Sequence, residues 1–327
     1  MKKVLITGAT GFLGSHLVEK NLEAGHKVRV FALPGDAKAA GLEARGVQVV
    51  YGDIRDYGAV KRGAEDVQIV FHLAAVVTDW APRKLFSQVN IEGMRNICRA
   101  SLEHGVERFV EVSTNDIFGL KEGVVMDEDF AFSYWKEPYA DTKIEATKIA
   151  WEYFQQGLPV TMVYPCWVYG PGDKTFVPEI IKALRDKSLI FWRKGALVWP
   201  AYVGNVIDLL MVIAENPAAV GHGFLVHDGV SDTFESFAAK IAESLGVPKA
   251  TRYVPYRAAY AASWCLELAW KLLGKKSRPL LTTYSVKNLG SRLQFSIDKA
   301  ERVLGWKPAV SYDEGFKKTM DWFKEPA

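Results

Sequence analysis

The first fourteen residues constrain the fold of this chain more than any other stretch. Residues 3–7 (KVLIT) have the composition of a short buried β-strand, and they lead directly into a turn with glycines at positions 8, 11 and 14. Residues 15–24 carry apolar side chains at helical spacing and predict an amphipathic helix. A strand, a glycine turn and a helix in this order suit a dinucleotide, because the turn lets the backbone approach the pyrophosphate and the helix N-terminus presents free N–H groups. A tight structural turn in an ordinary α/β protein is the alternative.

The first half of the chain alternates between strand-like and helix-like patterns. We expect further strands at residues 27–32, 47–51, 69–73, 108–113 and 160–164. The helical stretches between them, notably 83–104, predict an α/β fold, a Rossmann-type doubly wound parallel sheet with helices on both faces. We assign residues 1–174 to this nucleotide-binding domain. Residues 175–327, where the pattern becomes irregular, form mostly a smaller C-terminal substrate-binding lobe, with some later segments returning to the sheet.

Composition excludes several classes of protein. The three cysteines, Cys98, Cys166 and Cys265, are scattered without metal-ligand or disulfide spacing, so we expect reduced thiols, a cytoplasmic protein and no bound metal. The formal net charge of +3 is too small to indicate a nucleic-acid partner. No run of residues reaches the roughly 18 apolar positions of a membrane-spanning helix, and we expect no signal peptide.

A second motif follows the strand at 108–113. Pro138 suits the first turn of a helix, which would place Tyr139 and Lys143 about one turn apart on one face. A tyrosine titrates near pH ~10, and a nearby ammonium group lowers its pKa by favouring the phenolate. The hydroxyl of Ser113 or Thr114 could then hold a substrate oxygen while the tyrosine moves a proton. We predict catalytic roles for these four residues; an exposed helix pair is the alternative for Tyr139 and Lys143.

The order of these motifs resembles the extended short-chain dehydrogenase/reductase superfamily, whose cofactor turn looks like TGATGFLG (residues 7–14). Counting back from Phe118-Gly119, where that family usually shows Tyr-Gly, Thr114 falls on the catalytic hydroxyl. The resemblance implies an NAD cofactor, with NADP not excluded, and a homodimer formed through two long helices. It implies cofactor contacts from Gly8, Thr10, Gly11, Phe12, Leu13, Gly14, Asp53, Ile54, Leu73, Ala74, Ala75, Tyr139, Lys143 and Pro165.

The choice between NAD and NADP is left open by the second strand. An acidic residue at its end would hold the ribose of NAD and an arginine would accommodate NADP, but this chain has Ala32 and Leu33 there. Asp36 and Lys38 follow in a turn and could act either way. We favour NAD because no arginine is presented. For Asp53, a helix N-cap is as compatible with the local sequence as an adenine contact.

The substrate half is rich in aromatic residues. Residues 256–273 have a helical period with several aromatic side chains, and Lys275, Lys276 and Arg278 follow directly. This segment is either a core helix with a solvated basic end or an apolar lid in peripheral contact with a membrane. Residues 278–282 (RPLLT) and 295–300 (FSIDKA) resemble the 3β-hydroxysteroid dehydrogenase branch and its bacterial sterol relatives.

These observations predict an NAD(P)-dependent oxidoreductase that interconverts a secondary alcohol and a ketone on a small hydrophobic substrate, of the 3β-hydroxysteroid or sterol-like kind. A nucleotide-sugar epimerase on the same fold is the first alternative. A dehydratase fits less well, because Thr114-Asn115-Asp116 stands where dehydratases carry Thr-Asp-Glu. A cofactor-sensing binding protein is a further alternative, although such relatives typically lose the Tyr/Lys pair.

Overall fold

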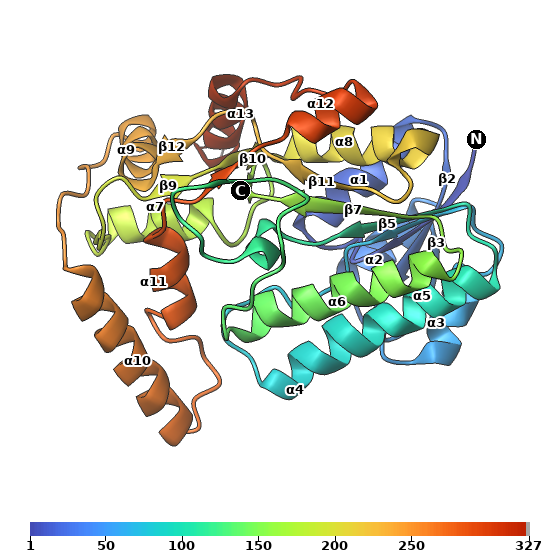
Figure 1. The fold of residues 1–327 in the computed structure, drawn as a ribbon, viewed down its shortest axis with the longest axis horizontal. Coiled ribbons are helices and arrows are strands. Elements are labelled where there is room, and N and C mark those ends of the chain that lie inside the picture. Colours follow the sequence, from blue (N-terminus) through green and yellow to red (C-terminus); the bar gives the residue numbers. More distant parts are fainter. Residues whose placement is uncertain (325–327) are drawn as a thin grey trace.

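A seven-stranded parallel sheet forms the centre of the structure, a computed structural model that describes residues 1–324 (Figure 1). Its strands are β1 (Lys3–Thr7), β2 (Lys27–Ala32), β3 (Gln48–Tyr51), β4 (Ile69–His72), β5 (Arg108–Val112), β7 (Val160–Pro165) and β11 (Gly223–Val226). They lie in the order β11-β7-β5-β4-β1-β2-β3, and every neighbouring pair is parallel. The chain runs outward in one direction from β1 to β3 and in the other from β4 onward. This switch point is where doubly wound sheets bind ligands, and the predicted fold class is confirmed.

Helices cover both faces of the sheet (Figure 1). One face carries α1 (Phe12–Glu23) and α8 (Val203–Glu215), which pack against each other. The other face carries α3 (Tyr57–Ala64), α5 (Gly93–Glu103) and α6 (Pro138–Gln155), while α2 (Ala37–Ala44) packs on β3. The central strands are buried on both sides, which explains their nearly continuous apolar sequence.

The long helix expected over 83–104 is interrupted in the structure. It begins as α4 (Arg83–Phe86), continues as a π-helical segment (Ser87–Glu92) and ends as α5. Such π segments are frequent at functional sites because they re-aim side chains within a helix. Here the segment carries Asn90, which is buried.

The C-terminal half both completes the sheet and builds a lobe beyond its edge. Its sheet strand β11 was not indicated by the sequence pattern. The remaining helices are α7 (Val177–Arg185), α9 (Phe234–Leu245), α10 (Tyr256–Leu272), α11 (Thr283–Leu289), α12 (Asp298–Leu304) and α13 (Tyr312–Lys324). Short strands pair as β8 (Trp167–Tyr169) with β10 (Pro200–Tyr202), β9 (Leu197–Val198) with β12 (Asp232–Thr233), and β6 (Val125–Met126) with β13 (Gln294–Phe295). Within residues 1–324, no helix combines the length and hydrophobicity that crossing a bilayer requires.

A large side chain in one sheet strand is matched by a glycine in the next strand. Tyr164 is fully buried in β7. Its ring lies against Gly223 of the neighbouring strand β11, where a Cβ atom would come within 2.5 Å of the tyrosine. The large side chain and the glycine therefore fit together across the sheet.

Candidate active site

The glycine turn between β1 and α1 is fixed by close backbone contacts. Gly8 adopts φ +70°, and a Cβ atom there would lie 2.8 Å from the backbone nitrogen of Ala74. At Gly14 a Cβ atom would lie 2.1 Å from the carbonyl oxygen of Gly8. Gly11 is the N-cap of α1, and glycine offers no side chain to occupy the first N–H groups of the helix, at Phe12 and Leu13. The turn therefore has the shape and the donors that a pyrophosphate requires.

Thr7 locks the ends of β1 and β4 together beside this turn. Its hydroxyl accepts hydrogen bonds from the backbone N–H groups of Leu73 and Ala74, each at 3.2 Å, and lies 2.8 Å from Nδ1 of His72. Burial lowers the pKa of His72 to about 3, so this imidazole is neutral and structural at physiological pH. Leu73, Ala74 and Ala75, which were predicted to contact the cofactor, leave the sheet next to the glycine turn.

The other side of the turn carries both an acid and a cation. The Thr10 hydroxyl donates to Asp36, the N-cap of α2, at 2.7 Å, and this bond lowers the pKa of Asp36. The ammonium group of Lys38 donates to the carbonyl oxygen of Thr10 at 3.1 Å. The nearby Lys174 lowers the pKa of Lys38, because two cations lie close together. Asp36 and Lys38, whose part in the choice between NAD and NADP the sequence left open, thus both lie next to the turn.

Asp53 and Ile54, in the loop that follows β3, have different surroundings. Asp53 accepts a hydrogen bond from the backbone N–H of Arg55 at 2.9 Å and pairs with its guanidinium group at 2.6 Å, which lowers the pKa of Asp53. The N-cap of α3 is Asp56, so the N-cap alternative for Asp53 is wrong. The side chain of Ile54 is buried against Gly93 of α5. It points into the core, and only its backbone remains for the predicted cofactor contact.

The predicted catalytic residues meet at the carboxyl end of β5. Tyr139 and Lys143 lie in the first turns of α6, and the hydroxyl of Thr114 is close enough to the Tyr139 phenol to act against the rise in the pKa of that phenol. Ser113 lies apart from this contact, since its buried hydroxyl is 2.8 Å from the hydroxyl of Thr147. The structure thus brings Thr114, rather than Ser113, to the phenol. Pro165 ends β7, the neighbour of β5, at the same edge of the sheet.

A buried ion pair holds Lys143 in place. Its ammonium group donates to Glu111 and to the carbonyl oxygen of Val112, both at 3.0 Å, and both charged side chains are almost wholly buried. Burial raises the pKa of Glu111, and the attraction of Lys143 opposes that shift. Sequence reasoning missed Glu111. The signal was present, because an acidic residue in the middle of an otherwise apolar strand is seldom buried without a partner.

A second acid lies beside the phenol. The hydroxyl of Tyr284, from α11, donates to the buried carboxylate of Asp116 at 2.6 Å. Burial raises the pKa of Asp116 to about 6, although the bond from Tyr284 lowers it. Burial and the nearby carboxylates of Asp116 and Glu111 also raise the pKa of Tyr139, against the effect of the Thr114 hydroxyl. No sequence pattern linked residues 116 and 284, which are far apart along the chain.

Asn90 connects the cofactor side of the site to the catalytic helix. Its carbonyl oxygen accepts from the backbone N–H of Val76, just beyond β4, at 2.8 Å. Its amide nitrogen donates to the hydroxyl of Thr142 on α6 at 3.1 Å. The residue thus ties a strand end to the helix of Tyr139 and Lys143.

The C-terminal lobe is tied to the loop after β4. Arg278 forms two hydrogen bonds to the carboxylate of Asp79, at 2.5 and 2.6 Å, and the hydroxyl of Thr282 donates to the same carboxylate at 2.5 Å. This contact holds the α10–α11 hairpin across the carboxyl ends of the strands. It places an aromatic side chain of the lobe against the predicted catalytic residue Tyr139, where the Tyr139 and Tyr284 rings are perpendicular with centroids 6.1 Å apart.

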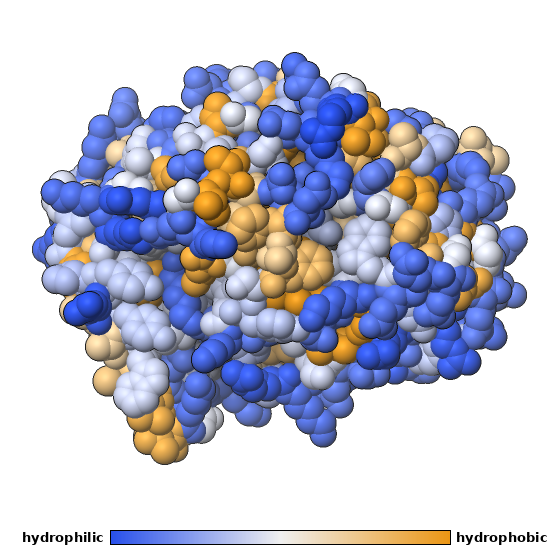
Figure 2. Space-filling model, viewed as in Figure 1, coloured by the Kyte–Doolittle hydropathy of each residue, from blue (hydrophilic) through white to orange (hydrophobic). Residues whose placement is uncertain are grey.

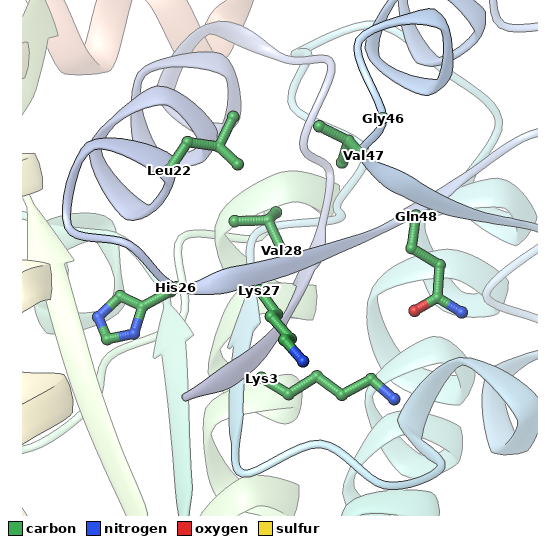
Figure 3. A pocket seen from close by; sticks show the side chains of 8 residues that line it. All are labelled: Lys3, Leu22, His26, Lys27, Val28, Gly46, Val47 and Gln48. Atoms are coloured by element: carbon green, nitrogen blue, oxygen red, sulfur yellow. The ribbon is translucent and has the colours of Figure 1, made fainter. Parts of the chain in front are cut away.

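A separate hollow of about 300 Å³ lies at the opposite end of the sheet (Figure 3). Its lining includes Lys3 and Lys27, the first residues of β1 and β2, and His26 just before β2. It therefore opens at the amino ends of the strands and is not part of the candidate site.

Comparisons with known proteins assign a family but not a substrate. Residues 4–226, more than half of the chain, match the NAD dependent epimerase/dehydratase family. Relatives of similar identity have different activities. A 2-alkyl-3-oxoalkanoate reductase of Stenotrophomonas maltophilia (strain K279a) is 27% identical, covering 97% of this chain and 98% of the relative. A 3beta-hydroxysteroid-dehydrogenase/decarboxylase of Arabidopsis thaliana is 28% identical (98% and 79% covered), and a UDP-glucose 4-epimerase of Vibrio cholerae is 29% identical (98% and 95%).

Solved structures agree on the fold. A dTDP-glucose 4,6-dehydratase from Streptomyces venezuelae with NAD bound superposes with a TM-score of 0.80 at 24% identity, covering 98% of this chain and 97% of that one. A UDP-glucose 4-epimerase of Thermotoga maritima gives a TM-score of 0.80 at 23% identity, with 98% of each chain covered. The glycine turn lies at the switch point, and the Tyr139–Lys143 pair of α6 lies at the end of β5, on the other side of β4. Together with the family match, these features show that the chain belongs to the NAD dependent epimerase/dehydratase family of extended short-chain dehydrogenases/reductases.

Proposed function

We propose that this protein is an NAD-dependent oxidoreductase that interconverts a secondary alcohol and a ketone on a hydrophobic substrate of the 3β-hydroxysteroid or sterol-like kind. The proposal depends on which groups surround the phenol of Tyr139. The Thr114 hydroxyl acts on this phenol at close range, and Lys143 lies one turn further along the same helix. A proton-transferring group beside a hydroxyl donor is what the oxygen of an alcohol or ketone needs.

Each residue has a distinct role in this proposal. Thr114 donates a hydrogen bond to the reacting oxygen, and Tyr139 takes the proton from that oxygen during oxidation or returns it during reduction. The ammonium group of Lys143 stabilises the phenolate form of Tyr139. The turn from Gly8 to Gly14 fits the pyrophosphate of the cofactor, whose nicotinamide ring, when bound, accepts or donates the hydride.

The charges of the C-terminal lobe favour an uncharged substrate. Free arginine and lysine side chains would favour the diphosphate of a nucleotide sugar, because they form charge-assisted hydrogen bonds with phosphate oxygens. Three cations of this lobe are already neutralised by carboxylates of the protein. These pairs are Arg193–Glu122, Arg278–Asp79 and Lys287–Glu137.

Aromatic rings next to the phenol support the same choice. Trp135 stacks on Tyr284 with ring centroids 5.6 Å apart, and Tyr284 in turn contacts Tyr139. The reductase of 2-alkyl-3-oxoalkanoates and the 3β-hydroxysteroid dehydrogenase/decarboxylase among the relatives act on molecules with large apolar parts, which is consistent with this lining.

A nucleotide-sugar epimerase is the second candidate. It is favoured by the similarity to the UDP-glucose 4-epimerase of Vibrio cholerae over 98% of this chain. The neutralised cations of the lobe argue against it, so the two candidates differ in the class of molecule that they would bind.

The test is turnover of three substrate classes by the purified protein with NAD and, separately, NADP. We expect formation of the reduced cofactor with a 3β-hydroxysteroid or a long-chain secondary alcohol, and no conversion of UDP-glucose to UDP-galactose. Tyr139→Phe should lower kcat by about 10²–10⁴-fold, the usual contribution of general acid–base catalysis. Tyr134→Phe, which alters an exposed tyrosine, is the control. Conversion of UDP-glucose without any response to alcohols would favour the epimerase.

A further inference from the structure

The outer face of α10 exposes a stripe of apolar side chains. Ala259 and Ser263 are buried on its inner face, which packs on α11. On the opposite face Trp264 is 56% exposed and Leu272 is 79% exposed, with Leu268 between them at helical spacing. Several exposed large apolar residues in a row are unusual for a helix that covers a core, because such a helix normally turns its polar side to water.

The stripe continues past the end of the helix. Leu273 is 66% exposed and Leu280 is 86% exposed in the turn that joins α10 to α11. In Figure 1 this end of α10 projects from the body of the protein, and Figure 2 shows hydrophobic residues at the same tip. We call the exposed side chains of Trp264, Leu268, Leu272, Leu273 and Leu280 the apolar tip.

Basic residues surround the apolar tip. Residues 264–280 contain four basic side chains, of which Lys271 pairs with Glu267 and Arg278 with Asp79, while Lys275 and Lys276 have no carboxylate partner within residues 1–324. Lys275 and Lys276 are exposed, and the ammonium group of Lys275 lies 4.5 Å from the centre of the Trp270 ring. A tip that is apolar at its centre and cationic around it is complementary to an anionic bilayer surface, where leucine and tryptophan enter the acyl boundary and lysines meet the headgroups.

The helix is held firmly enough to present this tip. The Glu267 carboxylate, on the inner face of α10, accepts hydrogen bonds from the backbone N–H and the hydroxyl of Thr283, at 2.7 and 2.8 Å. The same Thr283 hydroxyl oxygen lies 3.1 Å from the carboxylate of the buried Glu137, next to α6. The polar contacts of α10 therefore face inward, and its outer face is left to the apolar stripe.

We propose that the apolar tip and its lysines dock this protein on anionic membrane surfaces. A second copy of the chain is the less suitable occupant, because a two-fold interface centred on the tip would bring Lys275 and Lys276 close to their own copies. The docking proposal goes beyond the proposed activity and rests only on the outer face of α10, so either can fail without the other.

The exposed cysteine of the outer face allows a direct test. Cys265 lies on this exposed face of α10, whereas Cys98 and Cys166 are buried, so an environment-sensitive thiol fluorophore should label Cys265 selectively. Vesicles with about one quarter phosphatidylglycerol in phosphatidylcholine should shift its emission to shorter wavelength, and pure phosphatidylcholine should do so less. High salt should weaken the response, since lysine–headgroup attraction is screened.

Vesicle flotation of unlabelled variants completes the experiment. The Leu272→Glu/Leu273→Glu variant should bind the anionic vesicles at least about tenfold less well, because two apolar side chains no longer enter the bilayer. Val125→Glu changes another exposed apolar side chain, 58% exposed, that lies on β6, and it should bind like the wild type. Unchanged melting temperatures would show that the variants are folded.

Three results would overturn the docking proposal. The first is no binding of the wild type to anionic vesicles, and the second is equal binding by the Leu272→Glu/Leu273→Glu variant. The third is a wild-type dimer in solution that this variant converts to a monomer without any vesicle binding, which would make the tip an interface between copies.

Discussion

The hydroxyl of Tyr284 lies 2.6 Å from the carboxylate of Asp116, and this bond joins the C-terminal lobe to the loop that ends the fifth strand of the sheet. Asp116 follows Thr114 by two residues, so the lobe contacts the catalytic segment itself. The contact places a titrating acid beside the phenol of Tyr139, whose pKa it raises. The lobe therefore affects the chemistry of the site as well as covering it.

The pH dependence of stability should report Asp116. Burial raises the pKa of Asp116 from 3.8 to about 6 in the folded protein. The protonated carboxyl group therefore contributes to the free energy of unfolding, in full below pH 3.8, and this contribution is lost as the pH rises through about 6. Relative to wild type, Asp116→Asn should gain up to about 3 kcal/mol in unfolding free energy between pH ~4 and pH ~7.5. Urea titrations at both pH values would measure the gain, with the exposed Asp127→Asn as control. A pH-independent difference would contradict a raised pKa.

The pH dependence of turnover should respond to Tyr284. The bond from its hydroxyl lowers the pKa of Asp116, so Tyr284→Phe should move the inflection of kcat/KM that lies near pH ~6 to higher pH. Asp116→Asn should remove that inflection. Tyr260→Phe, on α10, is the control and should leave the profile unchanged. An inflection that stays in Asp116→Asn would assign it to another group.

The buried pair of Lys143 and Glu111 should be important for stability. Glu111→Gln leaves the ammonium group of Lys143 buried without its counter-ion, which typically costs about 3–5 kcal/mol. Urea unfolding at neutral pH measures the loss. Glu107→Gln, which removes a half-exposed carboxylate paired with Lys2, should leave the unfolding midpoint nearly unchanged. Equal effects of the two substitutions would mean that Lys143 finds another partner.

The close packing of the glycine turn predicts a sharp difference between two glycine-to-alanine substitutions. In Gly14→Ala the new methyl group would lie 2.1 Å from the carbonyl oxygen of Gly8, so the turn must shift. We expect NAD affinity measured by calorimetry to fall by at least about tenfold, because the backbone donors of the turn move. Gly41→Ala, inside α2 with no atom within 4 Å of the new methyl group, should raise stability by about 0.5–1 kcal/mol without changing affinity. Unchanged affinity in Gly14→Ala would separate the turn from cofactor binding.

Local sequence determined the elements of this protein and the order of its motifs. The apolar strand at 3–7, the glycines at 8, 11 and 14, and the four-residue spacing of Tyr139 and Lys143 are short-range patterns, and steric limits and helix geometry act on them directly. The parallel sheet followed from the alternation of strands and helices, because a helix between two strands carries the chain back so that the second strand runs in the same direction. The strand β11 lies in the second half of the chain, where the alternation of strands and helices is irregular, so the pattern did not predict it.

Only the tertiary structure decided which groups surround the phenol. Glu111 and Asp116 acquire their roles from burial, and Tyr284 reaches them from a helix far along the chain. The choice between Thr114 and Ser113 also depended on the fold, because neighbouring residues at a strand end point in opposite directions and only one meets Tyr139. Packing distance, burial and pKa are properties of the assembled chain, since each depends on atoms that the sequence separates and the fold brings together.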